Sequence, residues 1–275
     1  MRTSALLLCL LVPAAQACET SHLPLSGTAT VPTCSPQQDP ENCIYAGKAL
    51  YQYMDALPDS DDVLTIGLHA SPWRVYDGAM RILTIDELAT SSRTSLNGKV
   101  KRVELIGSWT GVSPAPGTPS LAQRLSDALG GIPVTGEDGF LWLSKDGSRR
   151  TTRQAFTLRE GGGSYFLPKD QDLLVSLAAG WFAQAEDVLP DDDANLQMLA
   201  AAGKDIFLLC PDDALVGFEH AAGIGSAIAA YNAAIMRLER GGTGDRTAAL
   251  ALLEQAAVLG DEKSKALLSL EKASK

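Results

Sequence analysis

The sequence predicts an α/β protein with a small parallel sheet and flanking helices, followed by an all-helical tail. Short apolar runs alternate with helical patterns between residues 63 and 135, and this order favours parallel strands joined by right-handed crossovers. From Ala221 onward the chain is rich in alanine and its pattern is almost purely helical. The 275 residues, 45% of them hydrophobic, are enough to build a sizeable core.

The first residues have the pattern of a secretory signal peptide. Arg2 precedes an apolar run over residues 5–12 and a small-residue exit over residues 14–17. The run is too short to span a bilayer, and no later segment is long and apolar enough to do so. We therefore expect residues 1–17 to be removed on export and the protein to be periplasmic.

Cleavage after Ala17 would make Cys18 the first residue, and two outcomes are then open. The Ala-x-Ala exit fits ordinary cleavage, whereas a lipid anchor on Cys18 would tether the chain to a membrane leaflet. Without the signal peptide an even set of cysteines is left, which can form two disulfides in three pairings. The set is Cys18, Cys34, Cys43 and Cys210. The Pro-rich and polar sequence of residues 18–43 favours a disulfide-stapled arm, and no ligand spacing supports a metal site.

Residues 44–160 form the predicted α/β domain. The predicted strands span residues 63–68, 103–107 and 132–135, followed by a hairpin over 139–147 with Asp146 and Gly147 in its turn. The predicted helices span residues 44–57, 85–91 with Thr84 as N-cap, and a segment that Ser120 caps and Gly130 and Gly131 end. A Gly- and Pro-rich loop over residues 111–119 precedes that last helix.

Residues 161–215 are expected to be a mostly helical connecting region, and residues 216–275 a helical repeat. The run Asp191–Asp193 is the solvated start of a helix rather than a metal cluster. Walker loops, paired-histidine zinc helices and dinucleotide fingerprints are absent from the sequence, so no cofactor is predicted.

The repeat is visible in the residues themselves. Residues 221–225, Ala-Ala-Gly-Ile-Gly, recur as Ala-Ala-Val-Leu-Gly at 256–260, with Tyr231-Asn232 and a glycine-rich turn at 241–244 between them. This order resembles a Sel1-like repeat, a relative of the tetratricopeptide repeat. The resemblance implies stacked helix pairs that bind proteins, although so short an array can also serve as a cap on the preceding domain.

A second resemblance concerns the strands. Residues 64–69, 103–111 and 120–125 resemble the core of caspase-like (clan CD) peptidases, in which a histidine ends one strand and a cysteine ends the next. By that match His69 would be the base, but Ser108 stands at the nucleophile position. A serine needs a positioned base, an orienting acid and an oxyanion hole, and residues 107–111 are not a nucleophile elbow. Three interpretations stay open: an active hydrolase, an inactive relative and an unrelated α/β domain.

The remaining candidates are aromatic side chains and the overall charge. Trp73, Trp109 and Tyr231 are candidate partner-binding residues, the two tryptophans because they follow predicted strands. The formal net charge of -10 argues against nucleic acid or an anionic membrane surface as main partner. It favours a basic protein surface, or serves only to keep the protein soluble.

Two functional hypotheses result. The first is a non-catalytic periplasmic protein that binds a protein partner. Signal-bearing Sel1-like proteins include periplasmic immunity proteins that neutralise antibacterial lipase effectors of type VI secretion, so the resemblance implies a secreted toxin as partner. The second is a periplasmic hydrolase of degenerate caspase-like type, with Ser108 as nucleophile, His69 as base and Asp77 or Asp86 as orienting acid.

Overall fold

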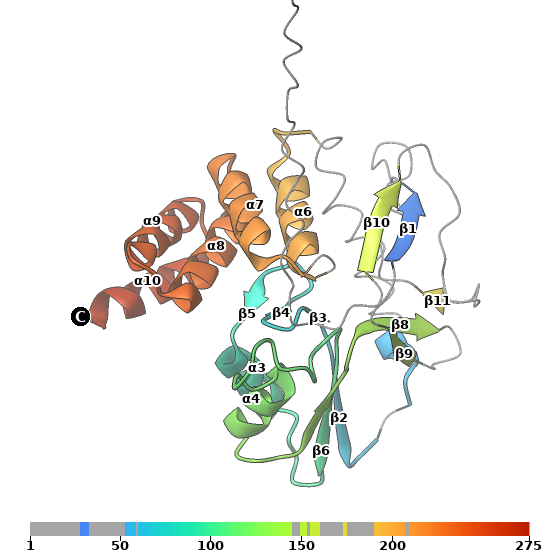
Figure 1. The fold of residues 1–275 in the computed structure, drawn as a ribbon. Coiled ribbons are helices and arrows are strands. Elements are labelled where there is room, and N and C mark those ends of the chain that lie inside the picture. Colours follow the sequence, from blue (N-terminus) through green and yellow to red (C-terminus); the bar gives the residue numbers. More distant parts are fainter. Residues whose placement is uncertain are drawn as a thin grey trace, which may run out of the picture.

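The computed structural model (Figure 1) describes residues 28–32, 53–58, 60–144, 149–152, 155–159, 173–174, 190–206 and 209–274. Its strands are β1 (Thr28–Pro32), β2 (Val63–Gly67), β3 (His69–Ala70), β4 (Val75–Tyr76), β5 (Ile82–Leu83), β6 (Arg102–Ile106), β7 (Val134–Gly136), β8 (Phe140–Ser144), β9 (Arg149–Thr152), β10 (Ala155–Arg159) and β11 (Leu173–Leu174). Its helices are α3 (Ile85–Arg93), α4 (Leu121–Ala128), α6 (Ala194–Ile206), α7 (Pro211–Gly223), α8 (Ala227–Arg240), α9 (Asp245–Val258) and α10 (Glu262–Ala273).

The predicted parallel sheet is confirmed. Its strands lie in the order β2-β6-β7, and both neighbouring pairs are parallel. The third strand begins two residues later than predicted, at Val134. Pro133 stands just before it and accepts a hydrogen bond from the backbone N–H of Val103, but proline has no N–H to return.

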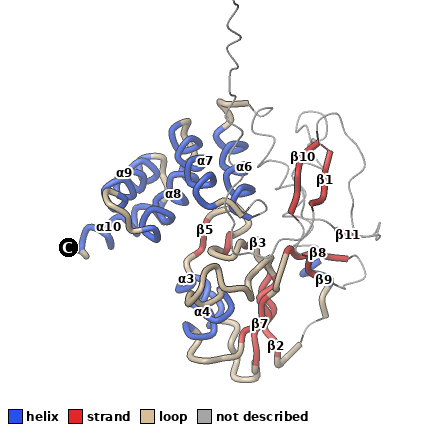
Figure 2. The backbone as a smooth tube through the Cα atoms, viewed as in Figure 1, coloured by secondary structure: helices blue, strands red, loops and turns tan. Residues whose placement is uncertain are grey.

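Helices α3 and α4 cover one face of this sheet, as the tubes in Figure 2 show. The predicted N-caps are both confirmed, because the Thr84 hydroxyl accepts from the N–H of Glu87 and the Ser120 hydroxyl accepts from the N–H of Gln123. Gly130 and Gly131 follow α4 with positive φ, so the chain can reverse there. The buried contact is made by Ala70, Val75, Ile85, Leu88, Ala89, Val103, Leu105, Leu121, Leu125 and Leu129.

Two antiparallel sheets flank the parallel one. Strands β3, β4 and β5 form a three-stranded meander, and β8 pairs with both β9 and β11. The predicted hairpin therefore exists, although its turn at Asp146 and Gly147 lies outside the described residues. The chain was expected to leave β2 at His69, but it bends one residue earlier and pairs His69 with Tyr76 across the meander.

The C-terminal part is all-helical, with five helices among the described residues, α6 to α10. Each helix contacts the next along the chain, so the helices form a curved array (Figure 1). Buried alanines allow this close packing: a Cβ added at Gly217 of α7 would come within 2.9 Å of the Ala201 Cβ of α6. The array begins at Ala194, well before residue 216, where the repeat was expected.

Alternate helices of the array face the sheet part. Contacts to the meander come from Asp205 on α6, from Asn232 on α8 and from Asp261, the N-cap of α10. Exposed apolar side chains occur on the intervening helices, at Val216 of α7 and Val258 of α9, and also at Leu270 of α10. The inner face of the array is therefore occupied by the same chain's meander.

The sheet part and the helical array also share a hydrophobic cluster, separate from the one between the parallel sheet and helices α3 and α4. Tyr76 and Trp109 of the sheet part pack in the same cluster as Phe218 of α7 and Leu253 of α9. No helix of the described residues is long and apolar enough to cross a membrane.

Candidate functional site

A buried ionic network joins the meander to α6 and α8. The Asp205 carboxylate, which is fully buried, accepts hydrogen bonds from the Ser71 hydroxyl at 2.6 Å, the Tyr76 hydroxyl at 2.7 Å and Nη1 of Arg74 at 3.2 Å. Nε of Arg74 donates to Oε2 of Glu239 at 2.8 Å. Burial would lower the pKa of Arg74, but Asp205 and Glu239 outweigh it and raise that pKa. The guanidinium is therefore held charged in the junction.

The network fixes the turn that presents Trp73. The backbone N–H of Ser71 bonds to the carbonyl of Arg74 at 2.9 Å, and the Ser71 hydroxyl also accepts from the N–H groups of Trp73 and Arg74. With the ends of the turn held in this way, Arg74 points into the protein and the Trp73 side chain stays partly exposed. A rigid turn with one accessible aromatic is well suited to recognition.

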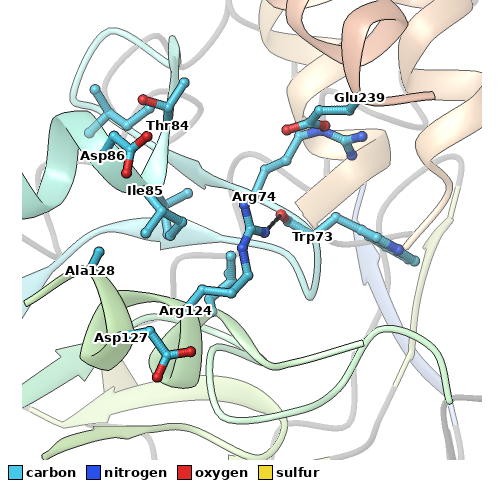
Figure 3. Close-up of a pocket in the computed structure, with 12 residues that line it drawn as sticks. Trp73, Arg74, Thr84, Ile85, Asp86, Arg124, Asp127, Ala128 and Glu239 are labelled. Carbon is cyan, nitrogen blue, oxygen red and sulfur yellow. Dashed lines mark hydrogen bonds and ion pairs between the residues drawn. The ribbon is translucent and has the colours of Figure 1, made fainter. Parts of the chain in front are cut away.

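Two adjoining cavities open around this turn. The first, of about 400 Å³, lies between the meander, α3, α4 and α8, and Figure 3 shows the side chains that line it. The second, of about 460 Å³, extends between α4 and the helices α7 and α8. Both cavities are lined by Trp73, Arg74, Arg124 and Glu239. We call the two together the junction groove.

The first cavity has an apolar wall and charged edges. Its apolar lining is Trp73, Val75, Leu83, Ile85, Leu121 and Ala128. Asp86 of α3 and Asp127 of α4 lie on one side, and Glu239 of α8 lies on the other (Figure 3). Nη1 of Arg124 donates to the backbone carbonyl of Trp73 at 3.5 Å. Grooves of this kind, between two structural parts, commonly hold ligands or partner side chains.

His69 follows β2 and Ser108 follows β6, but His69 is not arranged as a general base. Strands β2 and β6 pair in parallel with Gly67 opposite Ile106, and His69 and Ser108 each come two residues later, His69 already paired with Tyr76 in the meander. The His69 side chain is buried, and its Nε2 has no hydrogen-bond partner among the described residues. Burial lowers the pKa of His69 to about 4, so the imidazole is neutral and weakly basic at pH 7.

Ser108 belongs to a structural turn rather than to an open active site. Its hydroxyl is buried and accepts a hydrogen bond from the N–H of Leu141 at 3.0 Å. A Cβ added at Gly107 would lie 2.6 Å from the Leu68 carbonyl oxygen, and one at Gly111 would lie 2.8 Å from that of Gly136. The two glycines of residues 107–111 are thus required where backbones meet closely.

Among the described residues, neither candidate orienting acid is hydrogen-bonded to Nε2 of His69. The Asp77 carboxylate accepts from the backbone N–H groups of Ala79 and Arg81 and so shapes the turn between β4 and β5. Asp86 is exposed in the first turn of α3 and lines the junction groove. Within the described part of the chain, His69, Ser108 and an acid are not joined as a hydrogen-bonded triad.

Of the three aromatic candidates, only Trp73 lines the groove. Trp109 is 0% exposed, has a φ of 64° and packs edge-on against Phe140 with ring centroids 5.3 Å apart. Tyr231 is 2% exposed, and the Arg81 guanidinium lies 4.7 Å above its ring. The expectation of direct partner contact does not fit these two residues, because packing between the two parts of the protein covers both side chains.

The cysteine and metal predictions are addressed only in part. Cys210 is the N-cap residue of α7 and is disulfide-bonded, whereas Cys18, Cys34 and Cys43 lie outside the described residues. The pairing therefore stays a prediction. Asp191–Asp193 are exposed and lead into α6, where Asp193 accepts from the N–H groups of Asn195 and Leu196, as expected for a helix start. No metal-binding cluster occurs among the residues that the structure describes.

The sequence carried a signal for Asp205 that our prediction did not use. Met198, Ala201, Ala202 and Asp205 follow helical spacing on one face of α6, so an acid stands in an otherwise apolar stripe. Such a residue is rarely fully buried without a cationic partner. For Arg74, Arg124 and Glu239 we find no comparable local signal.

The comparisons with known proteins concern the sheet part. A family model described as a domain of unknown function (DUF8616) matches residues 36–151, which is less than half of the chain. The matched stretch includes the parallel sheet, the meander and the Ser71–Arg74 turn. No curated protein and no solved structure matches this chain.

Proposed function

We propose that this chain is an exported, non-catalytic protein-binding protein whose recognition site is the junction groove around Trp73. The partly exposed Trp73, held on a rigid turn and shared by two cavities, is the observation that carries the proposal. Tryptophan in such a setting is a frequent energetic centre of protein interfaces.

The arrangement of the enzyme-like residues supports binding over hydrolysis. The Ser108 hydroxyl accepts from a backbone N–H, and the His69 imidazole is buried with a lowered pKa. A nucleophile activated by a neighbouring base requires the opposite arrangement, an accessible hydroxyl hydrogen-bonded to a basic imidazole. The signal peptide at residues 1–17 supports a periplasmic location.

The partner that we propose is a secreted antibacterial toxin, as the resemblance to Sel1-like immunity proteins implies. In this proposal the inner face of the helical array holds the meander, and the partner meets the groove at the edge of the array. Binding would protect the cell by covering the toxin's active site, helped by charge complementarity.

A protection assay tests the proposal. If a secreted effector is encoded next to this chain, it is expressed in the periplasm of a sensitive strain, with the wild-type chain, Trp73→Ala or Val216→Ala. Val216 is an exposed residue of α7 that lies outside both cavities and serves as the matched control. We expect protection by the wild type and by Val216→Ala and loss of protection with Trp73→Ala. The absence of any effector gene beside this one, or full protection by Trp73→Ala, would contradict the proposal.

A further inference from the structure

The first cavity of the junction groove combines a short apolar strip, formed by the partly exposed Trp73, Leu83 and Ala128, with an excess of negative charge. Arg74 adds no net positive charge there, because both Asp205 and Glu239 pair with it. The other charged side chains that line the cavity are Asp86, Asp127 and Arg124. Two carboxylates thus stand against one guanidinium.

The positions of the two carboxylates leave both available to a ligand. Among the described residues, no basic side chain pairs with Asp86 or Asp127, and the Asp127 carboxylate accepts a hydrogen bond from the Gln123 amide at 2.8 Å. Asp127 also stands in the last turn of α4, where the helix dipole disfavours negative charge. The bond from Gln123, four residues earlier on α4, offsets part of this cost and holds the carboxylate at the mouth of the cavity.

We infer that this cavity binds the side chain of an arginine or lysine from a basic segment of a protein partner. The aliphatic stem would lie against the partly exposed Trp73, Leu83 and Ala128, and the cationic head would reach Asp86 and Asp127. A volume of about 400 Å³ can hold one such side chain. The inference rests on the proposed function and adds the chemistry of the partner.

The sign of the charge effects distinguishes this occupant from others. Arg124 lines the same cavity and repels a cationic guest, so replacing it with glutamine should strengthen binding. An acidic guest would show the opposite behaviour, since Arg124 would then be its main contact and the two aspartates would repel it. A second copy of this chain would give a concentration-dependent dimer.

The test uses N-acetylarginine amide as the probe and N-acetylcitrulline amide, which has nearly the same shape without the charge, as its control. Binding to the purified protein is followed by NMR through the indole N–H of Trp73, which is assigned with Trp73→Phe. We expect a saturable shift with the arginine probe and a much weaker one with citrulline. The double variant Asp86→Asn, Asp127→Asn should weaken arginine binding about fivefold, as two partly exposed ion pairs would.

A matched control removes the same charge elsewhere. Asp191→Asn, Asp192→Asn changes two exposed acids that line neither cavity, and it should leave arginine binding unchanged. The inference is overturned if the arginine probe gives no saturable shift or if both probes give equal shifts. It is also overturned if both double variants weaken binding equally, or if N-acetylglutamate amide binds more tightly than the arginine probe. If Trp73→Ala abolishes protection while Asp86→Asn, Asp127→Asn does not, the binding function stands and the basic partner chemistry is wrong.

Discussion

The buried carboxylate of Asp205 is expected to hold the two parts of the protein together. The change Asp205→Asn keeps the shape of the side chain and removes its charge. Ser71 and Tyr76 can still bond to the amide, because a hydroxyl group both donates and accepts. Arg74, whose side chain is 9% exposed, would keep only Glu239, which is 41% exposed.

The expected cost follows from this asymmetry. Removing one partner of a buried ion pair leaves an uncompensated charge and typically costs about 3–5 kcal/mol. Because Glu239 still compensates part of the Arg74 charge, we expect the free energy of unfolding to fall by about 3 kcal/mol. The control Glu239→Gln removes the exposed partner of the same guanidinium and should cost less than about 1 kcal/mol.

The assay is urea unfolding of the wild type and both variants at pH 7, with the slope against denaturant checked to be constant. A double variant with Arg74→Met should recover part of the loss, because it removes the charge that Asp205→Asn leaves unpaired. The reasoning is refuted if Asp205→Asn costs no more than Glu239→Gln, or if the Arg74 and Asp205 changes are additive.

Three further predictions concern the enzyme-like residues and the turn that holds them. Burial lowers the pKa of His69 from 6.5 to about 4. As the pH falls, the unfolded chain therefore binds a proton at His69 before the folded protein does. The free energy of unfolding should drop by about 2.5 kcal/mol between pH 8 and pH 4.5. His69→Gln should remove that part of the pH dependence in unfolding curves, whereas His220→Gln, at an exposed position, should not. Gly107→Ala should lower the thermal unfolding midpoint by several degrees, because its Cβ would lie 2.6 Å from the Leu68 carbonyl oxygen. The control Gly223→Ala, with open space around it, should be neutral or stabilising. Equal midpoints for the two variants would contradict the close approach at Gly107. Fluorophosphonate probes should not label the purified protein, and labelling that Ser108→Ala abolishes would revive the hydrolase hypothesis.

Much of the sheet part could be predicted because its signals are local. The strands of the parallel sheet read as short apolar runs, and the caps Thr84 and Ser120 act on amides three residues away. The same reasoning found the glycines that end α4. These features depend on neighbours in the sequence, and the structure confirms them.

The site could not be predicted in the same way, because it depends on contacts between distant residues. The sequence gives no hint that the side chain of Asn232 bonds to the backbone of Met80 and Ile82, about 150 positions away, or that Tyr231, its neighbour on α8, is buried as well. Trp73 and Trp109 follow strands alike, yet one lines a groove and the other is fully buried. Which aromatic side chain stays accessible is decided by the packing of the helical array against the meander.

The proposed binding of a partner at the groove around Trp73 is tested most directly by the affinity of the purified chain for the secreted effector that we propose as that partner. Truncation of a tryptophan at the centre of an interface costs about 2 kcal/mol or more, so Trp73→Ala should weaken binding by about 30-fold or more. Val216→Ala should bind as the wild type does. Equal affinities for all three proteins would contradict binding at the groove around Trp73, and so would loss of binding with Val216→Ala alone.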